Sequence, residues 1–208
     1  MRHRARFALG LMTVACALLA ATGLASASRL SVSNRNIRWT FARYTSNNAG
    51  IEISCELTLE GSFHSNTITK VRGTLIGHMN RTSVRSGCSG GWGDMRFLNE
   101  SLPWHITYQS FSGSLPSITA VTVDVIGFSW NYRGLGGGTC LYRSTTAGPA
   151  RWILNREAGG LITGVRADET IAVPFAGGEI TCAESINYRG LGRVSLTGTT
   201  TAIRVTLI

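Results

Sequence analysis

Acidic residues, lysine and helical periodicity are all scarce in this sequence of 208 residues. It contains 11 Asp and Glu against 20 Lys and Arg, and Lys70 is its only lysine. The formal net charge of +9 favours acidic partners, for example anionic cell-surface polymers. The arginines are scattered along the chain, however, which favours a general bias toward arginine codons over a binding patch. No stretch repeats apolar residues at the helical spacing, so the sequence predicts strands rather than helices.

Motifs of several common enzyme classes are also missing. The sequence has no phosphate-binding P-loop, no G-x-G-x-x-G before a helix and no S-x-x-K. Residues 87–91 are similar to the G-D-S-G-G of chymotrypsin-like proteases, but Cys88 replaces the aspartate. The histidine and aspartate that this family needs upstream are not found in their usual setting either. The sequence therefore favours a non-catalytic chain, and a small secreted hydrolase with an unrecognised site is an alternative.

An export signal is predicted at residues 1–27. Three arginines within residues 2–6 form a positive start, residues 7–24 are mostly apolar, and Ala25-Ser26-Ala27 supplies a small-residue cleavage site. Cleavage would leave residues 28–208, a length that fits a single domain, with a net charge of +6 once those three arginines are subtracted from +9. No later apolar run reaches membrane-spanning length. The chain is therefore expected outside the cell or in the cell envelope.

Two other fates of this N-terminal stretch stay open. The apolar run is long enough to anchor the chain in a membrane if it is not cleaved. Val14-Ala15-Cys16 is similar to the end of a bacterial lipobox, so lipidation of Cys16 is the second alternative, although Thr13 stands where that pattern has leucine. We favour cleavage because the small-residue site directly follows the apolar run.

Four cysteines remain after residue 27, namely Cys55, Cys88, Cys140 and Cys182. An even number in an exported chain predicts two disulfides. Three pairings are possible, and we favour Cys55 with Cys88 and Cys140 with Cys182 because each pair closes a local loop. A zinc site is disfavoured because neither C-x-x-C nor H-x-x-x-H is present.

Alternation of apolar and polar residues predicts strands in several places. The clearest is residues 51–59, where Cys55 lies on the apolar, inward face. Further alternating segments are residues 37–41, 104–108, 121–125 and 202–208, and weaker candidates are 67–79, 95–99, 152–154, 161–166 and 193–197. About ten short strands separated by glycine-rich turns predict a single all-β domain at residues 28–208. We favour an antiparallel β-sandwich, with a barrel as the alternative.

One hexapeptide, Asn-Tyr-Arg-Gly-Leu-Gly, occurs at residues 131–136 and again at 187–192. Each copy follows a strand candidate and contains two glycines, so each is expected to form a turn. Because aromatic faces and arginine side chains suit sugars and anions, we predict ligand-binding residues here. The candidates are Trp92, Trp130, Tyr132, Arg133, Tyr188 and Arg189, of which Trp92 and Trp130 are expected to be exposed. The alternative is two strand ends that share the same bulge, which glycine permits.

Two further groups of polar residues could carry chemistry. The first is His64, His78 and His105, and the second is Glu52, Glu56 and Glu60. Converging histidines would allow metal binding or acid–base catalysis, and paired acids could hydrolyse glycosides. The histidines are far apart in sequence, and the glutamates line the polar face of one amphipathic strand, so we interpret both groups as surface residues. No metal and no cofactor are predicted.

The segments Leu59-Glu60-Gly61-Ser62-Phe63-His64 and Leu102-Pro103-Trp104-His105 give the chain a resemblance to small exported proteins of soil actinobacteria that have no assigned function. That resemblance implies no catalytic or binding residue. The residues themselves favour an exported, non-catalytic β-domain that associates with the envelope or binds a ligand, and a carbohydrate-binding module is the alternative. The expected partners are glycans or anionic cell-surface polymers. Neither nucleic acid nor a membrane span after signal removal is predicted.

Overall fold

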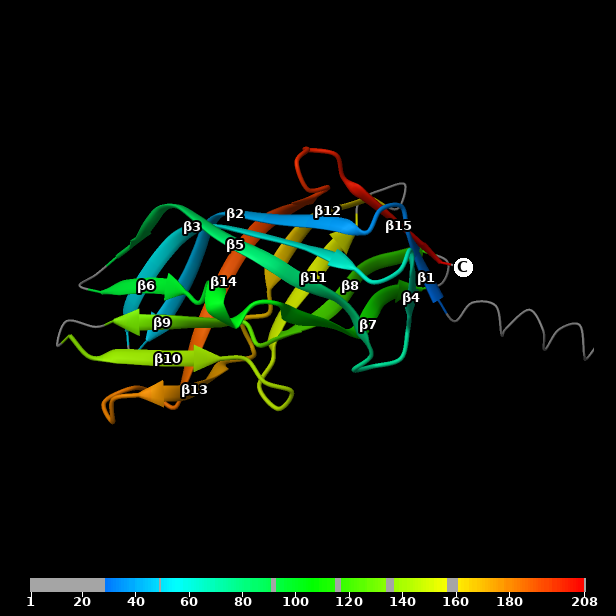
Figure 1. Cartoon of the computed structure of the whole chain (residues 1–208). Coiled ribbons are helices and arrows are strands. Elements are labelled where there is room, and N and C mark those ends of the chain that lie inside the picture. Colours follow the sequence, from blue (N-terminus) through cyan, green and yellow to red (C-terminus); the bar gives the residue numbers. More distant parts are fainter. Residues whose placement is uncertain are drawn as a thin grey trace, which may run out of the picture.

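The computed structural model describes residues 29–48, 50–90, 93–114, 117–133, 137–156 and 161–207. Strands dominate this part of the chain, and its one helical element is the single 3-10 turn η1 (Asn99–Ser101) (Figure 1). The predicted all-β class is therefore confirmed. The predicted export signal, Trp92 and residues 134–136 of the first hexapeptide lie outside the described residues. Within those residues, no helix has the length and apolar character needed to span a membrane.

Fifteen strands are described, more than the ten or so that the sequence predicted. In chain order they are β1 (Arg29–Val32), β2 (Asn36–Asn48), β3 (Ile51–Phe63), β4 (Thr67–Thr69), β5 (Leu75–Ser89), β6 (Asp94–Phe97), β7 (Trp104–Ser114), β8 (Ser117–Ile126), β9 (Ser129–Arg133), β10 (Thr139–Arg143), β11 (Ala150–Arg156), β12 (Leu161–Ala167), β13 (Val173–Gly178), β14 (Ser185–Ser195) and β15 (Ile203–Leu207). The predicted segment 67–79 contains parts of two strands, β4 and β5, and four further strands of four to six residues have no predicted counterpart, namely β1, β9, β10 and β13. Segments this short hardly show a period of two, so the pattern could not identify them.

Eight of the strands form a closed ring of antiparallel pairings. The ring runs through β2, β3, β5, β7, β8, β11, β12 and β14. It closes because β12 pairs with β11 along one edge and with β14, at Gly164–Arg166, along the other. Closure satisfies the backbone hydrogen-bonding groups that an open sheet would leave at its edges.

Smaller sets of strands extend the ring at its two ends. At one end, β15 pairs with β12 and carries β1 and β4. At the other end, β13 pairs with β14 and carries β10, β9 and β6, which lie side by side in Figure 1. The second set ends at β6, which within the described part of the chain pairs with a strand, β9, on one edge only. This terminal strand borders the groove described below.

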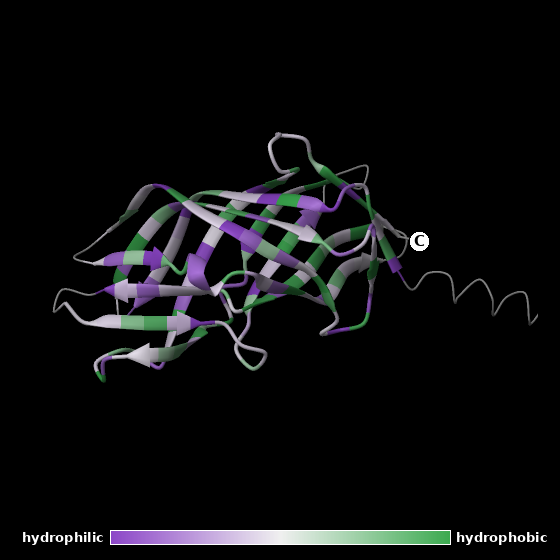
Figure 2. Cartoon of the chain, in the orientation of Figure 1, coloured by the Kyte–Doolittle hydropathy of each residue, from purple (hydrophilic) through white to green (hydrophobic). Residues whose placement is uncertain are grey.

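The core lies inside the ring, and its largest fully buried side chains are aromatic. Alternating apolar and polar residues follow each other along the strands in Figure 2, and the apolar ones point inward. Trp39 and Trp104, which lie in the alternating segments 37–41 and 104–108, are fully buried. The Trp152 ring packs against Phe41 and Tyr44, with 5.1 and 6.1 Å between ring centroids. Aromatic residues of this size dominate core energetics because each buries a large apolar area.

Both predicted disulfides are present with the favoured pairing. Cys55 and Cys88 lie opposite each other on β3 and β5, with 4.4 Å between their Cα atoms. Cys140, on β10, bonds to Cys182, which follows β13, and their Cα atoms are 5.6 Å apart. Cys55 lies on the inward face of its strand, as its phase predicted.

Candidate functional site

The second copy of the hexapeptide does not form a turn. Residues 187–192 lie within β14 and pair with β2, so the predicted turn is wrong for this copy. A bulge between Leu191 and Gly192 agrees with the alternative interpretation. Gly192 is required because a Cβ there would lie 2.6 Å from the carbonyl oxygen of Thr40. Of the first copy, residues 131–133 end β9.

The aromatic residues of both copies belong to the core. Trp130, Tyr132 and Tyr188 are each at most 2% exposed, so the predicted exposure of Trp130 and a sugar-binding platform formed by these rings are wrong. The Tyr188 hydroxyl accepts a hydrogen bond from the Arg151 amide at 2.6 Å and donates one to the Arg151 carbonyl oxygen at 3.1 Å. Burial raises the pKa of Tyr188 far above its ordinary value. The prediction that these rings are exposed failed because a tyrosine next to an arginine in the sequence is compatible with either a surface or a core position.

Arg133 and Arg189 are exposed, in contrast to the aromatic residues beside them. Arg189 forms an ion pair with Glu52, with 2.6 Å between Nη2 and Oε2. A hollow of about 340 Å³ adjoins Arg189 and Asn187, and Glu169 lines it from another segment. An anion bound in this hollow would have to compete with Glu52 for the guanidinium of Arg189.

The three glutamates of β3 form ion pairs on the outer surface. Glu60 pairs with Arg38 at 2.6 Å and with Arg81 at 3.6 Å. Glu56 pairs with Arg85 at 3.8 Å. Each acid is therefore neutralised along one solvated strand, rather than facing a second acid across a cleft as glycoside hydrolysis requires.

An open groove separates β5 from β6. These strands follow each other in the chain, but no ladder joins them in the described residues. The edge of β5 that faces β6 pairs with β7 only from Leu75 to Met79. Among the described residues, the same edge has no strand partner between Thr82 and Cys88, because β6 pairs with β9 instead. Two unpaired strand edges therefore flank a groove of about 280 Å³.

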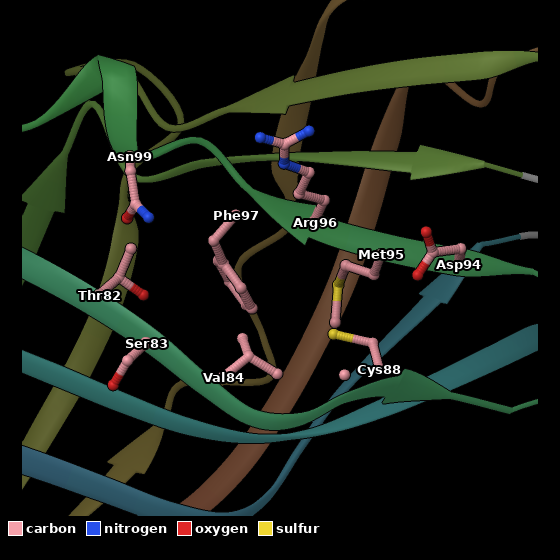
Figure 3. A pocket seen from close by; sticks show the side chains of 10 residues that line it. Thr82, Ser83, Val84, Cys88, Asp94, Met95, Arg96, Phe97 and Asn99 are labelled. Atoms are coloured by element: carbon pink, nitrogen blue, oxygen red, sulfur yellow. The ribbon is translucent and has the colours of Figure 1, made fainter.

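The groove has an apolar floor and a polar rim (Figure 3). Val84 and Phe97 point toward each other across the gap, and the Met95 thioether lies beside Cys88. The rim is formed by Thr82, Ser83, Asp94, Arg96 and Asn99. Thr82 is 6% exposed, and among the described residues its hydroxyl has no hydrogen-bond partner.

A second hollow, of about 560 Å³, lies over β7, β8 and β11. Asp124 and Arg151 form a two-pronged ion pair there, with distances of 2.7 and 3.0 Å. Arg72 borders the same hollow, and its Nε donates to Gln109 at 3.0 Å. The lining contains both polar and apolar groups, and the central pair satisfies itself, so this hollow suits a hydroxylated ligand better than a strongly charged one.

The three histidines among the described residues converge on the outer surface. The Nε2 atom of His64 lies 2.7 Å from Nδ1 of His78, and the ring centroids of His78 and His105 are 5.0 Å apart. Burial, with the nearby imidazoles of His64 and His105, lowers the pKa of His78. These residues lie at the surface, as interpreted from the sequence, but strand pairing brings their rings into contact, which their spacing in the chain did not indicate. Within the described chain, no three His, Cys, Asp or Glu side chains are already arranged to hold a metal ion.

Comparison with protein-family models, curated proteins and solved structures gives no match for the chain. The functional interpretation therefore depends on the geometry of the molecule itself. No sequence pattern predicted the groove. It exists only because β6 pairs with β9 rather than with β5, the strand that precedes β6 in the chain. The histidine convergence depends in the same way on strand register.

Proposed function

We propose that this protein is an exported, non-catalytic binding domain that holds an extended polypeptide segment between β5 and β6. The observation that carries this proposal is the pair of unpaired strand edges that flank one groove. A strand edge presents a row of amide and carbonyl groups, and an extended peptide satisfies them by adding itself to the sheet. Two disulfides fit an oxidising, extracytoplasmic compartment.

The side chains of the groove support a peptide rather than a sugar. In strand addition the backbone supplies affinity, and pockets for alternate side chains supply specificity. The floor of Val84, Met95 and Phe97 accepts an apolar side chain but offers no hydrogen bond to the hydroxyl groups of a sugar. Asp94 and Arg96 on the rim provide charges of both signs for the outward side chains of the peptide.

Contacts of the histidines support a non-catalytic role. A histidine base normally hydrogen-bonds to a nucleophile and is oriented by a third group. In the described residues, His64 bonds instead to His78, and His78 packs edge to face against His105.

Panning a display library of random peptides of about nine residues, the length of a typical strand, tests the proposal. Peptides selected on the wild-type chain should bind about tenfold more weakly to Val84→Arg, in which a charged side chain fills the floor. Arg85→Gln is the matched control, because Arg85 pairs with Glu56 outside the groove, and it should bind as the wild type does. Circular dichroism establishes that both variants are folded.

Amide hydrogen exchange provides an independent measurement. Bound peptide should slow exchange at the amides of residues 82–88, because strand addition engages the backbone of β5. Equal binding to both variants, or unchanged exchange at these amides, would contradict strand addition.

A carbohydrate is the second candidate ligand, and the hollow beside Asp124 and Arg151 favours it. Its size suits a mono- or disaccharide, and its lining offers hydroxyl, amide and guanidinium groups. Glycan-array binding that is lost in Arg72→Ala but kept in Val84→Arg would support this ligand in place of the peptide.

A further inference from the structure

We propose that His64, His78 and His105 form a binding site for a divalent transition-metal ion of the class that prefers imidazole, such as Zn²⁺ or Cu²⁺. The site lies on the outer face of the ring, apart from the groove between β5 and β6, so it does not depend on the function proposed above.

Strand register assembles the three imidazoles. His78 on β5 lies directly opposite His105 on β7. On the other side, β5 pairs with β3 so that Ser62 faces His78, and His64 follows two residues later. Neighbouring strands are about 4.8 Å apart, so side chains at facing positions on one surface touch. The ring centroids accordingly lie 4.5 Å apart for His64 and His78 and 5.0 Å apart for His78 and His105.

Two nitrogen atoms already point at each other. The 2.7 Å contact between Nε2 of His64 and Nδ1 of His78 is a hydrogen bond, in which one nitrogen donates and the other accepts. A tetrahedral ion with Zn–N bonds of about 2.0–2.1 Å holds its ligand nitrogens roughly 3.3 Å apart. An opening of about 0.6 Å would therefore let an ion replace the shared hydrogen.

Exposure of the outer two rings allows this adjustment. His64 and His105 are exposed and His78 is half-buried, so the outer rings can rotate about their side-chain bonds while the central one stays fixed. Rotation is needed because the three donors do not yet surround one point in the described structure. His105 then completes three imidazole ligands, and solvent or a partner molecule occupies the remaining position.

The donor set selects the class of metal. Imidazole nitrogen suits Zn²⁺, Cu²⁺ and Ni²⁺, whereas Ca²⁺ and Mg²⁺ require several oxygen ligands. The charges that act on His78 come from His64 and His105 rather than from a carboxylate. We therefore expect no binding of Ca²⁺ or Mg²⁺ at this site.

Isothermal titration calorimetry with Zn²⁺ tests the proposal, using the exported chain purified without a histidine tag. One ion should bind per chain, and His78→Asn should weaken binding by about tenfold or more because it removes the central ligand. Separate substitution of His64 or His105 by Asn should also weaken binding. Asn80→Ala, an exposed change two residues away on β5, is the matched control and should leave the affinity unchanged.

Titration with Cu²⁺ followed by electron paramagnetic resonance identifies the ligands. Nitrogen couplings from imidazole should be present in the wild type and reduced in each histidine variant. The absence of Zn²⁺ binding by the wild type, or equal binding by wild type and His78→Asn, would overturn the proposal. Binding that survives in His105→Asn at full strength would reduce the site to two ligands and overturn the three-histidine assignment.

Discussion

At the scale of single residues, the second copy of the hexapeptide has two structural roles that its sequence alone does not indicate. In the second copy, Tyr188 fills the core and satisfies both backbone polar groups of Arg151. Gly192 lets β14 pass close to Phe41 and the Thr40 carbonyl. Both roles depend on residues that β14 contacts in the fold. The sequence could therefore indicate that this tyrosine and this glycine are important, but it could not indicate which contacts they make.

Replacing Tyr188 by Phe should destabilise the protein by about 1–3 kcal/mol, because the Arg151 amide loses its hydrogen-bond partner in a partly buried place, whereas the Arg151 carbonyl keeps the amide of Asp168 at 3.0 Å. Urea denaturation monitored by tryptophan fluorescence measures the change. Tyr132→Phe is the matched control, since the Tyr132 hydroxyl makes only a long hydrogen bond of 3.4 Å to Ile51. A loss of stability as large in the control as in Tyr188→Phe would contradict this role for Tyr188.

Gly192→Ala should also destabilise the protein, by about 1–3 kcal/mol, because the added Cβ would overlap backbone rather than a flexible side chain. Gly164→Ala, on the neighbouring strand β12, is the comparison. A Cβ at Gly164 would meet its nearest atom at 3.7 Å, which is ordinary contact. Thermal unfolding of the two variants should therefore separate them clearly, and similar melting temperatures would show that the bulge relaxes to accept a methyl group.

At the scale of elements, local pattern identified the long strands but not their partners. The alternating residues 51–59 lie in β3, and residues 37–41 and 104–108 lie in β2 and β7. Their inward faces follow from the same period of two. The sequence did not indicate that β5 continues through residues 86–89, which contain glycine and serine, or that β6 leaves β5 for β9. Pairing between strands that are distant in the chain produces no recognisable pattern in the local sequence.

The free edge of β6 should be protected from self-association by its length of four residues and by two charged side chains, Asp94 and Arg96. We expect the double change Asp94→Thr with Arg96→Val to increase dimers and larger species in size-exclusion chromatography with light scattering. Arg193→Val is the control, because Arg193 lies on β14 between β2 and β12 and exposes no free edge. An equal increase in the control would indicate general surface hydrophobicity rather than edge pairing.

At the scale of the whole molecule, the ring and its extensions bring together residues that the sequence places far apart. Closure depends on Gly164–Arg166 meeting Leu191–Arg193, and the histidine cluster depends on the registers of β3, β5 and β7. The disulfides are long-range contacts that the sequence did predict. Four cysteines allow only three pairings, and the spacing favoured the pairing that closes two local loops. The hydrophobic pattern thus predicted which face of each strand points inward. The candidate sites, in contrast, depend on contacts between strands that are distant in the sequence.

The two disulfides should stabilise different parts of this architecture. Loops of 33 and 42 residues predict a similar loss, about 4 kcal/mol, when either bond is removed by paired substitution with Ala. Cys140–Cys182 ties the outer strands β10 and β13 together, so its removal should speed hydrogen exchange in β9, β10 and β13 while β2 and β3 stay protected. Removal of Cys55–Cys88 should instead loosen the end of β5 that lines the groove and weaken peptide binding there. Intact mass with and without reductant first establishes that both bonds form. A uniform loss of protection in both variants would show that ring and extension unfold as one cooperative unit.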